Sequence, residues 1–188
     1  QRQHIELMRD IAERFNARFA PGGEILVTPE HRIPEVGARI MDLQDPDSKM
    51  STTAASEEGT IYVLDEPEMI KRKLNRAVTD SDDPPVIAVD PSKRGVSNLL
   101  DILAACKGMT PDEAAAELAE ARGYGDLKAA VSDAVIEMLT PVRERYEQLR
   151  GDEAALEAIL LRGAEEAREI ASLTLSEVRA AMGVGPLA

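Results

Sequence analysis

Asp45-Pro-Asp-Ser-Lys-Met-Ser-Thr-Thr-Ala54 is a turn-forming stretch of small and polar residues with one lysine, Lys49, near its centre. It closely follows a compact apolar run, Val36-Gly-Ala-Arg-Ile-Met-Asp-Leu43. A strand that leads into such a loop can hold a lysine ammonium against the phosphates of a nucleotide. The stretch therefore predicts part of an α/β domain and makes Lys49 a candidate phosphate-binding residue.

The residues before this loop predict one helix and two short strands. Apolar residues recur there at intervals of three and four, as on one face of an amphipathic helix: Ile5, Met8, Ala12, Phe15 and Phe19. Pro21-Gly-Gly23 ends this helix, and Ile25–Thr28 and Arg39–Leu43 are expected to be short strands or extended segments. These elements are too few for a doubly wound sheet, so we expect the front of the α/β domain to lie upstream of Gln1.

From Thr60 onward the sequence predicts helices. Thr110-Pro-Asp-Glu113 has the form of a capping box with proline at the first helical position. Pro141 is expected to kink or interrupt a long helix, and Gly183 to end the last one. The predicted helices are residues 66–78 opened by Asp65, a segment capped by Ser97, a segment after Thr110, residues 126–150 and residues 152–182. We therefore expect an α/β part in residues 1–59 and an all-helical domain in residues 60–188, with a mostly helical chain overall.

Composition and charge limit the function classes. No apolar run approaches the eighteen or so residues that span a bilayer, and the single cysteine, Cys106, cannot form an internal disulfide, so a cytoplasmic protein is expected. Two histidines without clustered ligands argue against a zinc site. The net charge of −13 should repel a polyanion at long range, but local basic patches can still bind phosphate.

The tract Pro34–Thr53 resembles the second signature loop of the class I aminoacyl-tRNA synthetases, usually written KMSKS. The surrounding residues look like the bacterial tryptophanyl members of that family. Matches to the same pattern recur in order along nearly the whole chain: Gln1–Asp10, Leu64–Ile70, Ala77–Ser81, Gly95–Leu100, and Gly123–Gly125 with Lys128. Their order makes a coincidental resemblance improbable.

The resemblance implies a fold and a reaction. Residues 1–59 would be the C-terminal part of a Rossmann-type nucleotide-binding catalytic domain, and residues 60–188 a helical domain that binds the tRNA anticodon. A ligase of protein biosynthesis is implied, which activates tryptophan with ATP and Mg²⁺ and transfers it to tRNA-Trp. Its partners would be ATP, tryptophan and tRNA, with a homodimer for the full-length enzyme, and no metal site on the protein is implied.

The resemblance also assigns roles to single residues. Lys49 would be the catalytic lysine near the phosphates, where a closing loop stabilises the charge of the leaving pyrophosphate. Gln1 would help to bind the amino or carboxylate end of tryptophan. The residues implied in ATP binding are Ile40, Lys49, Met50, Ser51 and Thr52, and those implied in tRNA binding are Lys71, Arg72, Lys73 and Arg76.

Two departures from the family pattern stand out. Thr52 and Thr53 replace the second lysine and the last serine of the signature loop. Loss of one charge-assisted contact costs about 1.5–3 kcal/mol unless another cation replaces it. Nothing around His4 or His31 resembles the family's His-x-Gly-His motif, so we expect this piece alone not to activate tryptophan.

Two alternative functions stay open at this point. A tyrosyl-type relative shares the architecture, and the residues that form the amino-acid side-chain pocket are not in this sequence. A non-catalytic helical module that binds other proteins would fit the net charge and the changed signature loop. The basic residues from Lys71 to Arg76 also have a purely structural interpretation, because cations in the last turn offset the helix dipole.

Overall fold

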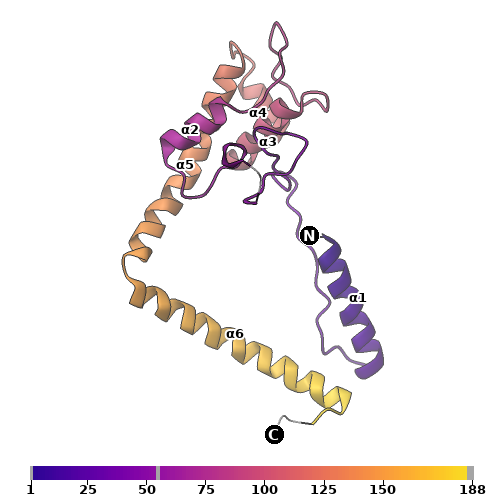
Figure 1. Cartoon of the computed structure of the whole chain (residues 1–188). Helices are drawn as coiled ribbons and strands as arrows, with labels where there is room; N and C mark the ends of the chain where they lie inside the picture. The colour runs from indigo at the N-terminus through magenta and orange to yellow at the C-terminus, as the bar shows by residue number, and fades with distance from the viewer. Residues whose placement is uncertain (1, 54–55, 186–188) are drawn as a thin grey trace. The chain divides into compact units, whose positions relative to one another are not determined.

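The computed structural model describes residues 2–53 and 56–185, whose regular elements are helices joined by long non-helical segments at residues 20–53 and 76–93 (Figure 1). The elements are α1 (Arg2–Phe19), the short 3-10 helix η1 (Glu57–Gly59), α2 (Pro67–Asn75), α3 (Arg94–Lys107), α4 (Pro111–Glu117), α5 (Tyr124–Arg150) and α6 (Glu153–Met182). The expectation of a mostly helical chain is confirmed.

The two predicted strands are absent from the described ranges. Residues 25–28 and 39–43 form no ladder, and the β-pairing there is an isolated antiparallel bridge between Met41 and Lys49. A strand needs a neighbouring strand that takes up its backbone N–H and C=O groups. Helix side chains meet part of that need here, as described below, so these backbone groups are bonded without a sheet.

Several predicted helix ends are confirmed. Thr110 and Glu113 form a reciprocal capping box with Pro111 in the first turn of α4. Gly183 ends α6 in the left-handed conformation at φ 70°, which costs glycine little because it has no Cβ. Helix α5 continues through Pro141, so of the two predicted outcomes the interruption is wrong and the kink stays a prediction.

Two predicted caps are wrong. Helix α2 has Glu66 as its N-cap, and the Asp65 carboxylate instead accepts hydrogen bonds from Tyr62 N and Lys73 Nζ. Helix α3 begins at Arg94, and Ser97 lies in its first turn, where its hydroxyl donates to Asp90 O. In both cases the polar side chain that the local pattern assigns to a cap bonds instead to a residue seven or eight positions away.

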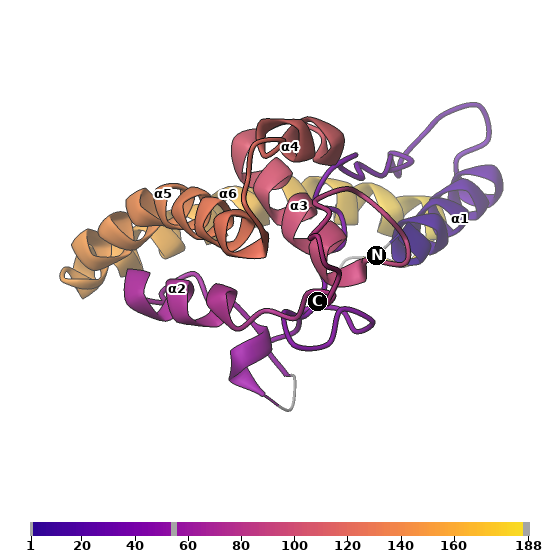
Figure 2. The same ribbon diagram turned by 90° about the horizontal axis from the view of Figure 1, so that it is seen from above.

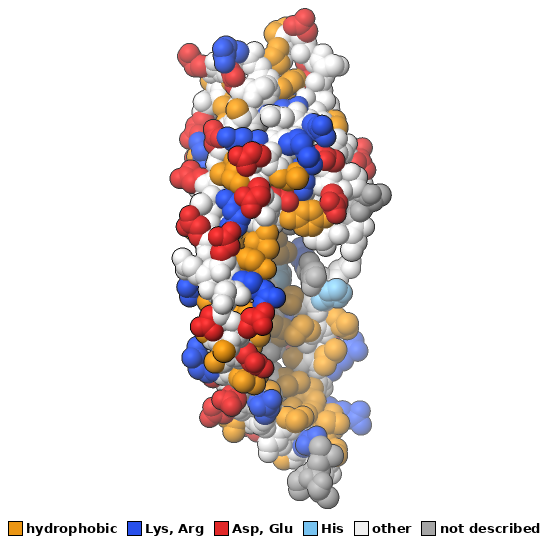
Figure 3. Space-filling view, turned by 60° about the vertical axis from the view of Figure 1, so that its left-hand side comes forward, with side chains coloured by type: hydrophobic (Ala, Val, Ile, Leu, Met, Phe, Trp, Pro, Cys, Tyr) orange, Lys and Arg blue, Asp and Glu red, His pale blue; other side chains and the backbone are white. Residues whose placement is uncertain are grey.

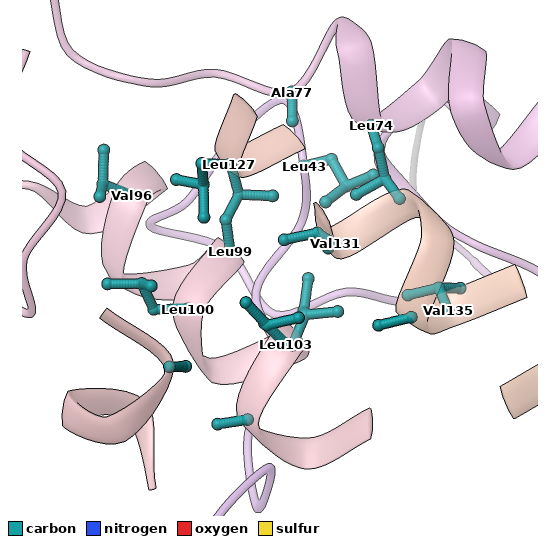
Figure 4. Close-up of a cluster of buried hydrophobic side chains, with 14 of the residues drawn as sticks. Leu43, Leu74, Ala77, Val96, Leu99, Leu100, Leu103, Leu127, Val131 and Val135 are labelled. Atoms are coloured by element: carbon teal, nitrogen blue, oxygen red, sulfur yellow. The ribbon is translucent and has the colours of Figure 1, made fainter. Parts of the chain in front are cut away.

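Residues 34–148 form a compact unit around one apolar core. Leu43, from the segment before the loop, meets Leu74 of α2, Leu99 and Leu103 of α3, and Val131 of α5 (Figure 4). Each is almost completely buried, and burial of one such side chain contributes about 1.5–3 kcal/mol. Helix α4 packs beside α3 (Figure 2). The core thus fixes the segment around Leu43 to three helices.

A second compact unit comprises residues 1–33 and 149–188. In it Asn16 of α1 holds the chain that follows the helix: its Oδ1 accepts from Ile25 N and Leu26 N, and its Nδ2 donates to Leu26 O. Helix α6 has no buried residue among its described positions. The predicted domain boundary between residues 59 and 60 stays a prediction.

The surface mixes charges of both signs. Acidic, basic and apolar side chains alternate over the face drawn in Figure 3, without one continuous basic area. Among the described helices, none combines the length and the apolar character that a membrane span requires.

Candidate nucleotide-binding loop

The loop that carries Lys49 is closed at its base by backbone hydrogen bonds. Asp42 N donates to Ser48 O at 2.9 Å, and Met50 N donates to Ile40 O at 3.1 Å. Together with the bridge between Met41 and Lys49, these bonds set the two stems of the loop side by side. The Lys49 side chain is exposed at this point, where it can meet a ligand from solvent.

A buried carboxylate shapes the first turn of the loop. Asp42 is 7% exposed, and its Oδ1 accepts hydrogen bonds from Gln44 N at 2.8 Å and Asp45 N at 3.1 Å. Gly59 packs against this carboxylate so closely that a Cβ there would lie 2.0 Å from Asp42 Oδ1. The turn therefore requires glycine at position 59, and Leu43 N donates to Gly59 O in the same contact.

The outgoing stem is held by hydroxyl groups. Thr60 is buried, and its Oγ1 donates to Ser51 O at 3.0 Å. The Ser51 and Thr53 hydroxyls lie 3.0 Å apart, and Thr53 N donates to Ser51 Oγ. Thr52, next to them, is exposed. The structure thus brings a lysine and three hydroxyl-bearing residues together on one short segment, which is a polar surface suited to phosphate oxygens.

Ile40 and Met50 turn their side chains toward the protein. Both pack on the core and line an apolar pocket of about 190 Å³ together with Ile61 of the outgoing stem and Cys106 of α3. Burial raises the pKa of the Cys106 thiol, so this group stays protonated and forms an apolar wall. With their side chains packed on the core, Ile40 and Met50 would meet a nucleotide through their main chain.

Helix α3 contributes two polar side chains to the loop. Asn98 is 3% exposed, accepts from Met41 N at 2.8 Å and donates to Met41 O at 2.9 Å. Arg94, one turn earlier, forms an ion pair with Asp47 inside the loop. The sequence offers a signal for Asn98 that our prediction missed: a polar residue stands at a buried position between Val96 and Leu99.

The basic residues of α2 divide into exposed and buried members. Arg72 and Arg76 are exposed and form ion pairs with Glu58 at 2.8 Å and 3.4 Å. Lys71 is also exposed. Lys73 differs from the predicted basic surface, because its side chain is 4% exposed and its Nζ donates to Asp65 Oδ2 at 2.6 Å.

Lys73 links α2 to the outgoing stem of the loop. Its Nζ donates to Thr60 O at 2.7 Å and lies 4.7 Å from the centroid of the Tyr62 ring. A side chain held in this way cannot reach a phosphate in solvent. The predicted tRNA-binding role of Lys73 is therefore replaced by a structural one. Gln1, the predicted tryptophan-binding residue, lies outside the described residues.

A polar cluster joins residues 80–93 to the start of α5. Tyr124 Oη donates to Asp80, and Lys93 Nζ pairs with Asp80 at 3.0 Å and with Asp82. Burial alone would raise the pKa of Asp80, but hydrogen bonds from Tyr124, the Asp82 backbone and Lys93 lower it. Next to this cluster, Gly95 lets α3 pack on the backbone, since a Cβ there would lie 2.1 Å from Val78 O.

Comparison with known proteins identifies the family. The model for "tRNA synthetases class I (W and Y)" matches residues 1–140. This chain belongs to that family. Two class I relatives are named tryptophan–tRNA ligase: one from Clostridium perfringens (strain 13 / Type A) is 42% identical over 186 residues, and one from Oceanobacillus iheyensis is 46% identical over 190 residues. They cover 99% and 98% of this chain, which in turn spans 54% and 55% of their lengths.

Solved structures of class I synthetases agree with this membership. Tryptophanyl-tRNA synthetase from Mycoplasma pneumoniae matches with a TM-score of 0.84 and 30% identity, over 98% of this chain and 54% of that protein. The enzyme from Campylobacter jejuni, complexed with ADP and tryptophan, matches with a TM-score of 0.61 and 27% identity, over 96% of this chain and 54% of that protein. The chain therefore spans about half the length of the relatives and structures that it matches.

Proposed function

We propose that this chain is the C-terminal part of a tryptophan–tRNA ligase, which activates tryptophan with ATP and transfers it to tRNA. Membership of the class I family and relatives of that name at 42% and 46% identity support the proposal. The observation that carries it is the loop at Lys49, where an exposed ammonium stands beside hydroxyl groups on stems fixed to the core.

In this proposal the loop binds the phosphates of ATP, and Mg²⁺ enters with ATP as part of the substrate. Lys49 stabilises the negative charge that develops on pyrophosphate as it leaves. Ser51 and Thr52 offer hydroxyl groups to the phosphates, and the main chain at Ile40 and Met50 meets the adenine. The residues up to 59 would complete a Rossmann-type domain, the helical residues 60–188 would meet the anticodon, and a cytoplasmic homodimer stays a prediction.

The basic surface proposed for tRNA consists of two residues of α2 and the residue that caps its C-terminus, Arg76. Lys71, Arg72 and Arg76 are exposed, and the last two share a single carboxylate, Glu58. Exposed ion pairs of this kind contribute little to stability, at most about 1 kcal/mol, so an RNA phosphate can replace the carboxylate at small cost. Near the Lys49 loop such a surface would supply local positive charge on a chain whose net charge is −13.

Replacing Lys49 tests the proposed function. In an enzyme with the full length of the relatives, Lys49→Ala should slow tryptophan-dependent ATP–pyrophosphate exchange by about 10- to 100-fold, since one charge-assisted contact contributes about 1.5–3 kcal/mol. Tryptophan binding should change little. Lys107→Ala, which removes an exposed lysine elsewhere, is the matched control and should keep the full rate.

Two results would contradict the proposal. Exchange that depends on tyrosine and not on tryptophan would assign the chain to the tyrosyl members of the family. An equal loss of tryptophan affinity and of rate in Lys49→Ala would mean that the lysine has no special role with phosphates.

A further inference from the structure

One buried side chain of α3 binds Met41, in the incoming stem of the Lys49 loop, in addition to the backbone bonds that close the loop. Met41 lies in a segment without a strand ladder, and both its backbone N–H and its C=O bond to the Asn98 side chain. Met41 is also the residue bridged to Lys49. A single amide therefore fixes the backbone position that lies directly opposite the lysine.

The position of Asn98 in the fold makes this link rigid. Asn98 is 3% exposed, between Val96 and Leu99, both of which are buried in the core. A polar side chain at such a place is unfavourable unless its hydrogen bonds are made, so the two bonds to Met41 hold the amide in one orientation. The core of residues 34–148 thereby fixes the position of Met41 in the loop stem.

We propose that Asn98 is a positioning residue for Lys49: through Met41 it holds the lysine where the proposed reaction needs a cation. This inference rests on the proposed function, because it assigns a role within the same site. The amide itself is buried beneath the loop and does not meet substrate. Arg94, paired with Asp47 one helical turn away, restrains the tip of the same loop.

Two variants at position 98 test the role, in an enzyme with the full length of the relatives. Asn98→Ala removes both bonds and should lower the kcat of tryptophan-dependent ATP–pyrophosphate exchange, per active site, by on the order of 10- to 100-fold, because small misplacement of a reacting group has effects of that size. The KM for tryptophan should stay near the wild-type value. Active sites are counted by burst titration, so a loss of folded protein does not enter the rate.

Asn98→Asp gives a readout that a purely structural role would not move. Its ionised carboxylate accepts from Met41 N but cannot donate to Met41 O, whereas the protonated acid can do both. The rate per active site, divided by the wild-type rate, should therefore rise as the pH is lowered. Leu100→Val, a fully buried change on the same helix, is the matched control and should alter stability but not the rate per active site.

The double variant Lys49→Ala with Asn98→Ala separates this inference from the proposed function. If Asn98 acts through Lys49, the double variant should be no slower than Lys49→Ala alone. Rate losses that multiply would overturn the positioning role while leaving the proposed function intact. A normal rate for Lys49→Ala would overturn both.

Discussion

Removal of the buried ammonium of Lys73 should destabilise the unit of residues 34–148. The ion pair with Asp65, at 2.6 Å, has a Coulomb attraction of about 6 kcal/mol at an effective dielectric constant of about 20. Desolvation of the two ions costs several kcal/mol each, so the intact pair contributes little net stability. Lys73→Met leaves the Asp65 carboxylate without its cation, and losses of this kind are about 3–5 kcal/mol.

The lower end of that range is expected, because the Asp65 side chain is 14% exposed and water can reach it. Lys73→Met also loses the bond to Thr60 O and the contact with the Tyr62 ring, which add to the cost. Adding Asp65→Asn to Lys73→Met gives a double variant in which the unpaired carboxylate charge is removed. The double variant should therefore be more stable than Lys73→Met alone by about 2 kcal/mol or more, as for other buried ion pairs replaced on both sides.

Urea unfolding measured by tyrosine fluorescence checks this prediction. All three tyrosines, Tyr62, Tyr124 and Tyr146, lie within residues 34–148, so their signal reports the unfolding of that unit. Lys71→Met is the matched control, since Lys71 is exposed two positions earlier on the same helix. A loss of unfolding free energy below about 1 kcal/mol for Lys73→Met would refute the energetic role of the buried pair. A double variant that is less stable than Lys73→Met alone would refute it as well.

Two further predictions concern other parts of the same unit. Gly59→Ala should destabilise it by about 1–3 kcal/mol, because the new Cβ would displace the Asp42 carboxylate. Gly125→Ala, in open space in α5 of the same unit, should not, and equal effects of the two changes in urea unfolding would contradict the requirement for glycine. Asp80→Asn should lower the melting temperature at pH 7. Folding lowers the pKa of Asp80, so the ionised carboxylate contributes to stability at any pH above its pKa in the unfolded chain, about 3.9. This contribution to stability is lost as the pH falls through the lower pKa of the folded protein. The difference from wild type should thus close below about pH 4, and a difference constant down to pH 2 would contradict this.

Local signals in the sequence predict helix ends well when the cap is made within the helix. The Thr110 capping box and Gly183 need only residues within a few positions, and both are confirmed. Asp65 and Ser97 fail as predicted caps because each side chain bonds instead to a residue eight or seven positions away, Lys73 and Asp90. A pattern of neighbouring residues does not identify such partners, so it assigns both side chains to helix caps.

The residues of the candidate site likewise divide into those that a local pattern predicts and those that it does not. An exposed Lys49 on a short polar loop agrees with its motif. The buried Lys73 could be found from its spacing, since it lies three residues after Ile70 and four before Ala77, on the apolar face of α2. Treating it with its neighbours as one basic cluster hides that spacing. The contact between Gly59 and Asp42 joins residues far apart in the sequence, and no spacing rule predicts it.

The two strands that fail to form share one physical explanation. Residues 25–28 and 39–43 have the composition of strands, and in each an asparagine on a helix supplies hydrogen bonds to the backbone. Asn16 bonds to the backbone of Ile25 and Leu26, and Asn98 bonds to both backbone groups of Met41. The primary amide has the same donor and acceptor as a peptide group, so it can complete an extended segment one residue at a time. Residues 39–43 have backbone partners as well, since Asp42 N donates to Ser48 O and Leu43 N donates to Gly59 O. The stem beneath Lys49 is therefore held by the buried amide of Asn98 together with backbone bonds to its own loop, and its position does not depend on a sheet.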